Sequence, residues 1–451
     1  MPTSTEGTGI ASGTRTIDDF YQGTKAAVSG GTTFVIDCVM PDTGESMVDA
    51  YNKWRGWADE MVCCDYALRV AVNSSVEGDV KRDMEELTGA EFGINSFWFD
   101  MEAKRSRMSD TDLMSAFAEC AKLGCLAQVH AESGDIVERN SKQLLEMGVT
   151  GPEGFFMAHS EAAEEEATMR ATALASQVNC PLYITSMSSA AAAEILRAKK
   201  SRGNVVFGET TPASLACDGE EYFNSCWRHA AAYVTRPPIR KGQSEQLVNA
   251  AVADNDGEAA FDVLASNHMT YNASQKALGA RDFTKIPPGV NGIESRLSVL
   301  WEKGVHSGKM TPERFVALTS TIPAKIFNVF PDKGKIAVGS DADIVIWNPT
   351  AVKTIGKEDH NLKTDFNIFE GMKCHGVPEF VIVQGRVVVD EGHLRAMQGL
   401  GKFVALAPFA PHVFEKVRAR EAATVESRTM RPVVRTGSKR LEFTCSCLVT
   451  T

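Results

Sequence analysis

The residues best suited to chemistry lie in the stretch CLAQVHAESGD, residues 125–135. Mostly apolar residues lead into His130, and the carboxylates of Glu132 and Asp135 follow closely. A histidine at the end of an apolar strand, with carboxylates just beyond it, is how many hydrolases begin a metal site. The spacing therefore makes His130 a candidate metal ligand, and its partners must come from the ends of other strands.

The other predicted strand ends offer few partners for such a site. Ser186 and Asn267 are neutral, and a serine hydroxyl is a poor ligand for a transition metal. His268 is the other histidine that follows a predicted strand. Two interpretations of His130 stay open: a metal ligand, or a buried histidine that is satisfied by hydrogen bonds. The second is the more common situation for a lone histidine.

Two arginines, Arg105 and Arg107, follow the third predicted strand. Guanidinium groups stay protonated, so these residues would oppose the binding of dications near that strand end. They fit either a solvated charged loop or contacts to a bound anion. The sequence has no G-x-S-x-G turn, no Walker loop and no G-x-G-x-x-G that opens a helix after a strand. It therefore gives no basis for nucleophilic hydrolysis or nucleotide-dependent chemistry.

The positions of these candidate residues depend on a repeated pattern of predicted strands and helices. Short apolar, β-branched runs alternate with helical patterns, and we predict strands over residues 32–39, 67–72, 94–100, 126–132, 181–188, 204–210 and 262–268. Strands that alternate with helices predict a parallel sheet, and at this length the expected α/β fold is a (β/α)8 barrel. The count predicts a barrel that lacks its first strand in this chain.

The pattern changes after about residue 330. Residues 333–349 and 378–393 alternate apolar and polar positions, which predicts antiparallel strands of a small, incomplete β-sandwich. From about residue 418 the chain is polar and basic, which is typical of disorder. The predicted organisation is a flexible N-terminus (1–15), the barrel (16–330), the sandwich portion (331–400), a C-terminal helix that packs back (401–417) and a disordered basic tail (418–451).

Composition limits the partners and the compartment. The net charge is −11, but residues 413–451 carry eight Lys or Arg against four Glu, so the body is more acidic than the whole. An acidic body argues against nucleic-acid binding. No run of about 18 apolar residues predicts a membrane span, and the N-terminus lacks the features of a secretory signal. We therefore expect a cytoplasmic protein whose 11 cysteines are free thiols.

Several longer strings carry a specific resemblance. They include DDFYQGTKAAVSGGTT, WADEMVCCDYAL, AQVHAESGDI, GVNGIESRLSVLWEKGVHSGKM, KIFNVFPDKGKIAVGSDADIVIWNP and NIFEGMKCHGVP. In these strings, from about residue 17 to 420, the chain resembles the dihydropyrimidinases and their relatives, the collapsin response mediator (dihydropyrimidinase-related) proteins. The resemblance implies an amidohydrolase-type barrel with a β-sandwich, and usually a homotetramer. The enzymes begin about sixty residues earlier, so we expect a short isoform.

The resemblance also implies a ligand set for two zinc ions: an H-x-H pair, a carbamylated lysine, two histidines and an aspartate. Carried over to this chain, the lysine position falls on Lys104 and one histidine position on His130. The second histidine position falls on Ser186 and the aspartate position on Asn267. The H-x-H pair has no counterpart, and a substrate-polarising tyrosine falls near Arg107. Four of six ligand positions are therefore expected to be missing.

From these losses we expect no bound metal or cofactor and no catalysis. The mediator proteins are similarly depleted, so the resemblance implies a non-enzymatic scaffold that binds tubulin or other cytoskeletal and adaptor proteins during axon growth, in neuronal processes. Self-association or co-assembly with full-length relatives is also expected. Two alternatives stay open: a metal-dependent cyclic-amide hydrolase, and an anion-binding sensor that uses the old pocket.

The last candidate contact is the segment RTMRPVVRTGSKR, residues 428–440. It carries five basic residues and no acid. We expect it either to be a solvated tail or to contact an acidic surface such as the tails of tubulin, and phosphorylation would then weaken the contact. The candidate residues are Thr429, Arg431, Arg435, Thr436, Ser438, Lys439 and Arg440.

Overall fold

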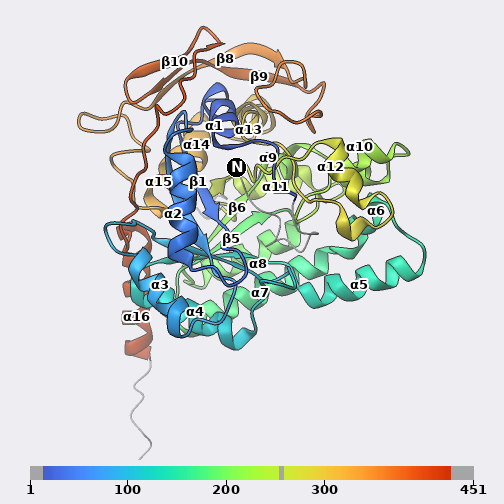
Figure 1. The fold of residues 1–451 in the computed structure, drawn as a ribbon. Coiled ribbons are helices and arrows are strands. Elements are labelled where there is room, and N and C mark those ends of the chain that lie inside the picture. Colours follow the sequence, from blue (N-terminus) through green and yellow to red (C-terminus); the bar gives the residue numbers. More distant parts are fainter. Residues whose placement is uncertain (1–13, 253–258, 428–451) are drawn as a thin grey trace, which may run out of the picture.

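The computed structural model describes residues 14–252 and 259–427, and two sheets organise them (Figure 1). The first sheet has seven parallel strands in sequence order: β1 Phe34–Val39, β2 Asp65–Ala71, β3 Ser96–Asp100, β4 Leu126–His130, β5 Leu182–Met187, β6 Val206–Thr210 and β7 Val263–Leu264. Each strand overlaps one of the seven predicted runs. The prediction of a parallel barrel-type sheet is therefore confirmed, with β1 and β7 at the two edges.

Helices alternate with these strands and cover the sheet on its outer side (Figure 1). They are α1 Phe20–Ser29, α2 Met47–Ala58, α3 Gly78–Leu87, α4 Asp110–Leu123, α5 Gly134–Glu146, α6 Pro152–Ala158, α7 Glu161–Gln177, α8 Ala190–Ser201, α9 Pro212–Ala216, α10 Trp227–Ala232, α11 Ser244–Ala251, α12 Ala273–Lys276, α13 Arg296–Leu300, α14 Pro312–Val316, α15 Ile322–Ile326 and α16 Pro411–Ser427.

Local sequence explains where these helices begin and end. The Ser46 side chain accepts hydrogen bonds from the N–H groups of Val48 and Asp49 in the first turn of α2, and the Ser109 side chain accepts one from Asp112 in α4. Gly124 ends α4 at a φ of 73°, a conformation that costs glycine little. The next residues enter β4 directly, so this turn fixes the strand that ends at His130.

The second sheet is antiparallel and has the order β11–β10–β9–β8. Its strands are β8 Ile344–Thr354, β9 Lys373–Val383, β10 Arg386–Asp390 and β11 His393–Leu394. It lies beside α1 and α13 at one end of the barrel-type sheet (Figure 1). This confirms the predicted small antiparallel domain after residue 330.

A buried lysine connects the two sheets. Lys333 Nζ lies 2.7 Å from Asp65 at the start of β2, 2.9 Å from Asp341 and 2.6 Å from Asp343. Burial alone would lower the pKa of Lys333, but its bonds to the three carboxylates outweigh burial and raise it. The lysine therefore stays charged while it holds β2 against the segment that enters β8.

The C-terminal region differs from the expected helix over 401–417. Residues 401–410 run alongside the barrel-type sheet, where Phe403 pairs with Tyr66 of β2. The helix begins at Pro411 and continues to Ser427, because its sequence is rich in Ala, Glu and Arg, which favour helix. The expected start of disorder at residue 418 is therefore wrong. Residues 428–451, with all the tail candidates, lie outside the described residues, as do residues 1–13.

Two further expectations concern cysteines and membranes. The nine cysteines among the described residues are free thiols, in agreement with the sequence. Within the same part of the chain, none of the helices combines the length and the apolar character that a membrane span requires.

Candidate active site

A cavity opens at the carboxyl ends of the parallel strands, which is where (β/α) barrels place their chemistry. Its volume is about 90 Å³. One water requires roughly 10–15 Å³ on a similar measure, so the cavity has room for several waters or one small ring. It is lined by Cys38, Met40, Arg69, Trp98, His130, Thr185, Ser186, Thr235, Arg236, Asn267, Met269, Pro288 and Gly289.

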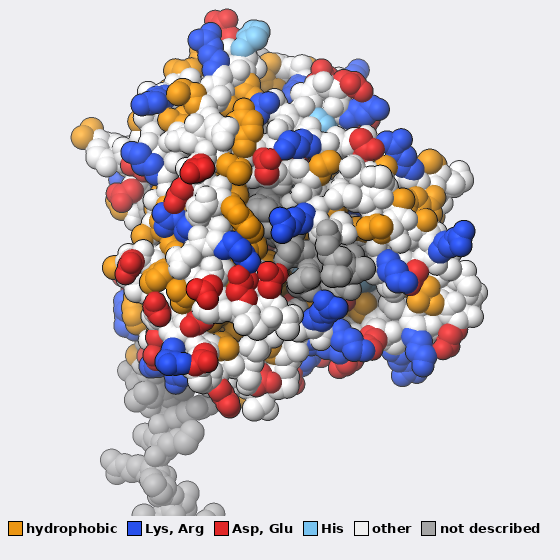
Figure 2. All heavy atoms as spheres, in the orientation of Figure 1, with side chains coloured by type: hydrophobic (Ala, Val, Ile, Leu, Met, Phe, Trp, Pro, Cys, Tyr) orange, Lys and Arg blue, Asp and Glu red, His pale blue; other side chains and the backbone are white. Residues whose placement is uncertain are grey.

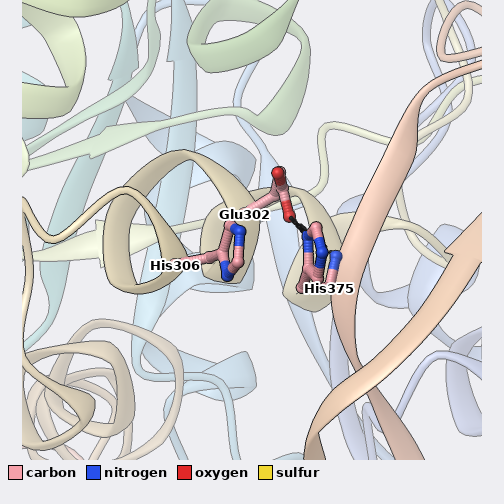
Figure 3. A group of neighbouring side chains, drawn as sticks. All are labelled: Glu302, His306 and His375. Atoms are coloured by element: carbon pink, nitrogen blue, oxygen red, sulfur yellow. Dashed lines mark hydrogen bonds and ion pairs between the residues drawn. The ribbon is translucent and has the colours of Figure 1, made fainter.

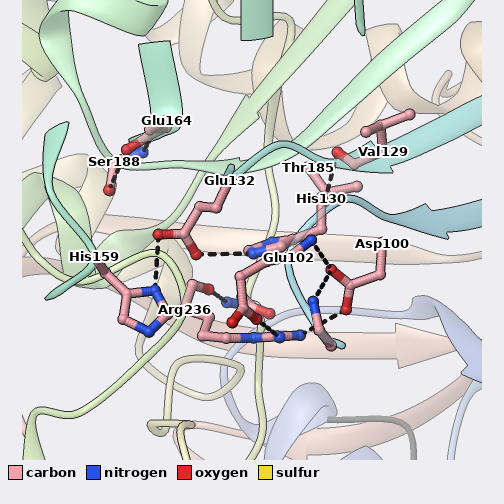
Figure 4. A network of polar contacts seen from close by, with 12 residues as sticks. Asp100, Glu102, Val129, His130, Glu132, His159, Glu164, Thr185, Ser188 and Arg236 are labelled. Atoms are coloured by element: carbon pink, nitrogen blue, oxygen red, sulfur yellow. Dashed lines mark hydrogen bonds and ion pairs between the residues drawn. The ribbon is translucent and has the colours of Figure 1, made fainter. Parts of the chain in front are cut away.

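His130 belongs to a buried chain of hydrogen bonds (Figure 4). Its Nε2 lies 2.9 Å from Glu132 Oε2, and the other oxygen of Glu132 lies 3.1 Å from Nδ1 of His159. The three side chains are only 5%, 0% and 6% exposed. Burial would raise the pKa of Glu132, but the two imidazoles outweigh burial and hold it well below the usual range. Glu132 is therefore a carboxylate that fixes both rings.

The same carboxylate changes the titration of His130. Burial and the charge of Arg236 both favour the neutral ring, but Glu132 and Asp100 outweigh them and raise the pKa of His130. One ring nitrogen is occupied by Glu132, so His130 can offer the other nitrogen to a ligand or a proton.

Arg236 forms a second buried group beside this chain (Figure 4). Its guanidinium lies 3.1 Å from Asp100 Oδ2 and also bonds Glu102. Asp100 accepts two backbone N–H bonds, from Glu102 at 2.8 Å and Ala103 at 3.1 Å. Burial would raise the pKa of Asp100, but Arg236, His130 and these bonds lower it. Arg236 is thus a fixed cation at the wall of the cavity.

Arg69 is the less neutralised of the two arginines in the cavity. It is held on β2 and bonds the neutral side chain of Gln128. Within the described residues its Nε has no hydrogen-bond partner. The nearby Cys38 is a protonated thiol, because burial raises its pKa to about 11. The Nε of Arg69 is buried, but the residue lines the cavity and Gln128 and Cys38 are neutral, so its other N–H groups can donate to an oxygen atom there.

The two positions at which we expect metal ligands to be missing, Ser186 and Asn267, have an unusual backbone. Ser186 and Asn267 have φ values of 55° and 43°, in the left-handed region that residues other than glycine seldom adopt. Ser186 donates its N–H and hydroxyl to Glu209 Oε1, at 2.9 and 3.2 Å. Asn267 donates to the carbonyl oxygen of Arg236. Strained positions of this kind concentrate at functional sites, and both residues line the cavity.

The structure places Lys104, Arg105 and Arg107 elsewhere. Lys104 is 76% exposed and pairs with Glu138 at 2.7 Å, and Arg105 is also exposed. Arg107 pairs with Glu138 and with Asp135. None of the three lines the cavity, because they follow the end of β3 rather than lie on it. The placement of Lys104 beside His130, and of the two arginines as pocket contacts, is therefore wrong.

Sequence reasoning missed three residues that line the cavity: Trp98, Arg69 and Arg236. Trp98 lies on β3 between the buried Phe97 and Phe99, so its side chain points to the opposite face and reaches the cavity. Arg69 is the lone charge in the apolar run ALRVAV, which is the signal that could have revealed it. His268 pairs with Asp18 at 3.1 Å and does not line the cavity.

The lining residues do not fit the pair of zinc ions that the resemblance implies. A two-metal site needs several anionic or imidazole ligands that converge on the ions. Here, among the described residues, the lining offers the imidazole of His130 and no carboxylate, Ser186 and Asn267 are neutral, and the guanidinium groups of Arg69 and Arg236 face the same space. No reaction step can therefore be assigned to zinc in this cavity.

A family model described as the amidohydrolase family matches residues 17–388. The chain belongs to this family. It is 49% identical to dihydropyrimidinase of Rattus norvegicus over 412 residues, which cover 91% of this chain and 78% of the rat protein. It is 44% identical to dihydropyrimidinase-related protein 5 of Homo sapiens over 406 residues, which cover 90% of this chain and 71% of the human protein.

Solved structures agree with this assignment. The crystal structure of dihydropyrimidinase from Brevibacillus agri matches with a TM-score of 0.85 and 37% identity, over 88% of this chain and 85% of that one. A crystal structure of D-hydantoinase matches with a TM-score of 0.84 and 35% identity, over 88% and 85%. These comparisons contradict the prediction that the chain is not an enzyme, because proteins named as enzymes match it over most of its length.

Proposed function

We propose that the chain is a cyclic-amide hydrolase of the dihydropyrimidinase type and that the cavity around His130 is its active site. The observation that carries this proposal is the cavity itself, which lies at the catalytic end of the barrel-type sheet in a chain 49% identical to a dihydropyrimidinase. The names of the relatives indicate the substrate class, a small ring that contains an amide bond.

The walls of the cavity suit such a ring. Trp98, Met40 and Met269 supply apolar surface for its faces. Arg69 can donate N–H groups to a ring carbonyl, since the side chains that its guanidinium bonds, Gln128 and the thiol of Cys38, are neutral. A positioned donor at a carbonyl oxygen stabilises the negative charge that develops there during amide hydrolysis.

His130 is the candidate general base. Glu132 fixes one ring nitrogen, so at a pH above its raised pKa the ring of His130 is neutral and can accept a proton from water at the other nitrogen. The water oxygen bonds to the carbonyl carbon, the C–N bond breaks, and the ring nitrogen takes the proton that His130 accepted from water. The acid that forms loses its proton to the solvent. The product is an open chain with a carboxylate, whose charge matches Arg69. No zinc is part of this mechanism.

Purified chain incubated with dihydrouracil or hydantoin tests the proposal. We expect chromatography to show the ring-opened acid, with kcat/KM reduced at least about tenfold in Arg69→Met and in His130→Gln. Lys104→Ala is the matched control at an exposed charge and should retain the wild-type rate. EDTA should leave the rate unchanged. If the wild-type chain opens neither ring at millimolar substrate, the proposal fails.

A second candidate is a role in protein assembly, which the relative named dihydropyrimidinase-related protein 5 favours. Apolar side chains are exposed around the antiparallel sheet, among them Ile336 at 80%, Val338 at 108% and Val352 at 58%. Where such side chains form one contiguous patch, they indicate association. Self-association, co-assembly with full-length relatives and binding of tubulin in neuronal processes stay proposals. Analytical ultracentrifugation and tubulin co-sedimentation test them, and a stable monomer that fails to co-sediment would contradict them.

The surface gives a further guide to partners. On the face shown in Figure 2, acidic and basic side chains are interspersed and do not form one extended basic area. Nucleic-acid binding normally needs such an area. The expectation that the chain does not bind nucleic acid is consistent with this face and stays a prediction.

A further inference from the structure

A cluster of two histidines and a glutamate lies outside the lining of the active-site cavity. Glu302 and His306 come from η5 Trp301–His306, a single turn of π-helix, and His375 comes from β9 (Figure 3). The four-residue spacing puts Glu302 and His306 on one side of that helix. The cluster therefore joins the helical layer to the antiparallel sheet.

The three side chains are already close together. Glu302 Oε2 accepts the backbone N–H of His375 at 2.7 Å and lies 3.0 Å from its Nδ1. The rings of His306 and His375 stack at a centroid distance of 3.6 Å with 9° between their planes. One potential ligand atom from each residue lies within 4.8 Å of the other two.

This set matches the ligands of a borderline transition dication. Zn²⁺ forms bonds of about 2.0–2.2 Å to imidazole nitrogen and carboxylate oxygen in a tetrahedron, so its ligand atoms stand roughly 3.3 Å apart. The 3.0 Å separation of Glu302 Oε2 and His375 Nδ1 is close to that value. Hard ions such as Mg²⁺ prefer oxygen ligands and would be disfavoured by the two imidazoles.

One movement is required. Two stacked rings cannot both direct an in-plane nitrogen at one ion, so His306 must tilt out of the stack. His306 is exposed, which leaves room for that rotation, and His375 is 34% exposed.

The surrounding charges set the strength of the site. Lys303, Lys309 and Lys373 line the groove next to Glu302, and Lys309 is paired with Glu245 at 2.6 Å. These ammonium groups oppose a cation, so tight binding is not expected. A different carboxylate cluster, Asp65 with Asp341 and Asp343, already has Lys333 bonded to all three of its members. The histidine cluster has no such internal cation.

We propose that Glu302, His306 and His375 bind one transition dication of the Zn²⁺ class, separate from the active-site cavity, with a fourth position open to the groove. Binding replaces the hydrogen bond between Glu302 and His375. The Nδ1 proton of a neutral ring moves to Nε2, and that of a doubly protonated ring goes to the solvent, so the ion bonds Nδ1 of a neutral imidazole. The ion then links η5 to β9.

Equilibrium dialysis of the metal-stripped full chain against Zn²⁺ at pH 7.5 tests the site. We expect one saturable site with a Kd in the micromolar range, and at least a tenfold weaker Kd in His306→Gln and in His375→Gln. His306 is exposed, so its replacement should not unfold the chain. Co²⁺ as a probe should give the visible absorption of a four-coordinate ion in wild type, and this band should be absent from His306→Gln.

The matched control is His229→Gln. His229 also pairs with a glutamate, Glu221 at 2.6 Å, and is 42% exposed, but it has no second histidine beside it in a metal-type cluster. It should bind Zn²⁺ as wild type does. Equal Zn²⁺ binding by wild type and a His306→Gln, His375→Gln double variant would overturn the proposal, as would an equal loss in His229→Gln. Ring opening should be unaffected by His306→Gln, so the two proposals fail independently.

Discussion

Two clusters in this molecule combine a glutamate with two histidines, and they differ in what they leave available. Glu132 is fully buried and each of its oxygens is bonded to a ring, of His130 and of His159. In the other cluster, Glu302 is 21% exposed and uses one oxygen for His375. The first arrangement fixes its histidines in the fold, whereas the second keeps ligand atoms accessible. The same residue types therefore support different chemistry according to how fully their hydrogen bonds are satisfied.

The largest expected effect comes from breaking the buried cluster. Glu132→Gln removes a fully buried negative charge from between two imidazoles that are themselves at most 6% exposed. Breaking a buried ion pair at one partner costs about 3–5 kcal/mol of unfolding free energy. Urea denaturation followed by circular dichroism measures this cost. The comparison variant is Glu302→Gln, for which we expect less than about 1 kcal/mol because its partners are partly exposed. Equal costs for the two variants would show that the clusters do not differ as described.

Arg236→Met should have the next largest effect. It leaves Asp100 buried with a charge that two backbone N–H groups still stabilise. Because the buried carboxylate of Asp100 is then only partly satisfied, we expect the free energy of unfolding to fall by about 2–3 kcal/mol. Arg170→Met is the matched control, since Arg170 also bridges two carboxylates, Glu166 and Asp110, but at the surface. A control as destabilised as Arg236→Met would argue against burial as the cause.

The pH dependence sharpens the comparison further. The folded-state pKa of His130 is raised, so the stability it contributes is complete below its unfolded pKa of about 6.5 and is lost as pH rises through the folded value. The folded-state pKa of Glu132 is lowered, so its contribution is complete above about pH 4.3 and is lost as pH falls through the folded value.

Both contributions are therefore present between about pH 4.5 and 6.5. We expect the difference in unfolding free energy between wild type and His130→Gln to be greatest in that range and to narrow above it. Denaturation curves at several pH values measure the difference. A difference that widens with increasing pH would show that the stabilised form of His130 is the neutral ring.

The smallest effect is expected at Lys104. The residue is 76% exposed, and its pair with Glu138 is surrounded by solvent. Lys104→Ala should change the free energy of unfolding by less than about 0.5 kcal/mol. Thermal denaturation is sufficient to check this. A loss of several kcal/mol would restore Lys104 to a structural or site role.

The sequence predicted the strands well and the site only in part. Each parallel strand is a short run rich in β-branched residues. Burial on both faces restricts such strands to mostly apolar residues, so they are easy to recognise in the sequence. His130 was found because it ends such a run. Lys104 was misplaced because it lies four residues beyond Asp100, the last residue of β3, where the chain has already turned to the surface. The position of a residue in the sequence does not reveal that turn of the chain.

Arg236 and the histidine cluster show a different limit. Arg236 follows no strand, and it reaches the cavity only because tertiary packing brings its loop to Asp100. His375 and Glu302 are 73 residues apart in sequence. Neither contact has a periodic signal, so both depend on the three-dimensional arrangement and could not be predicted from local patterns.

The bonds of Lys333 to Asp65, Asp341 and Asp343 have a consequence for how the chain can be divided. A cut at residue 330 would leave Asp65 in one fragment and the buried ammonium in the other. Separation of the two sheets would leave Lys333 and Asp65 without the ion pair that links the sheets. We therefore expect the two sheets to unfold together in one cooperative transition. The boundary that is visible in the sequence pattern near residue 330 is therefore a change of architecture and not a boundary between two autonomous folding units.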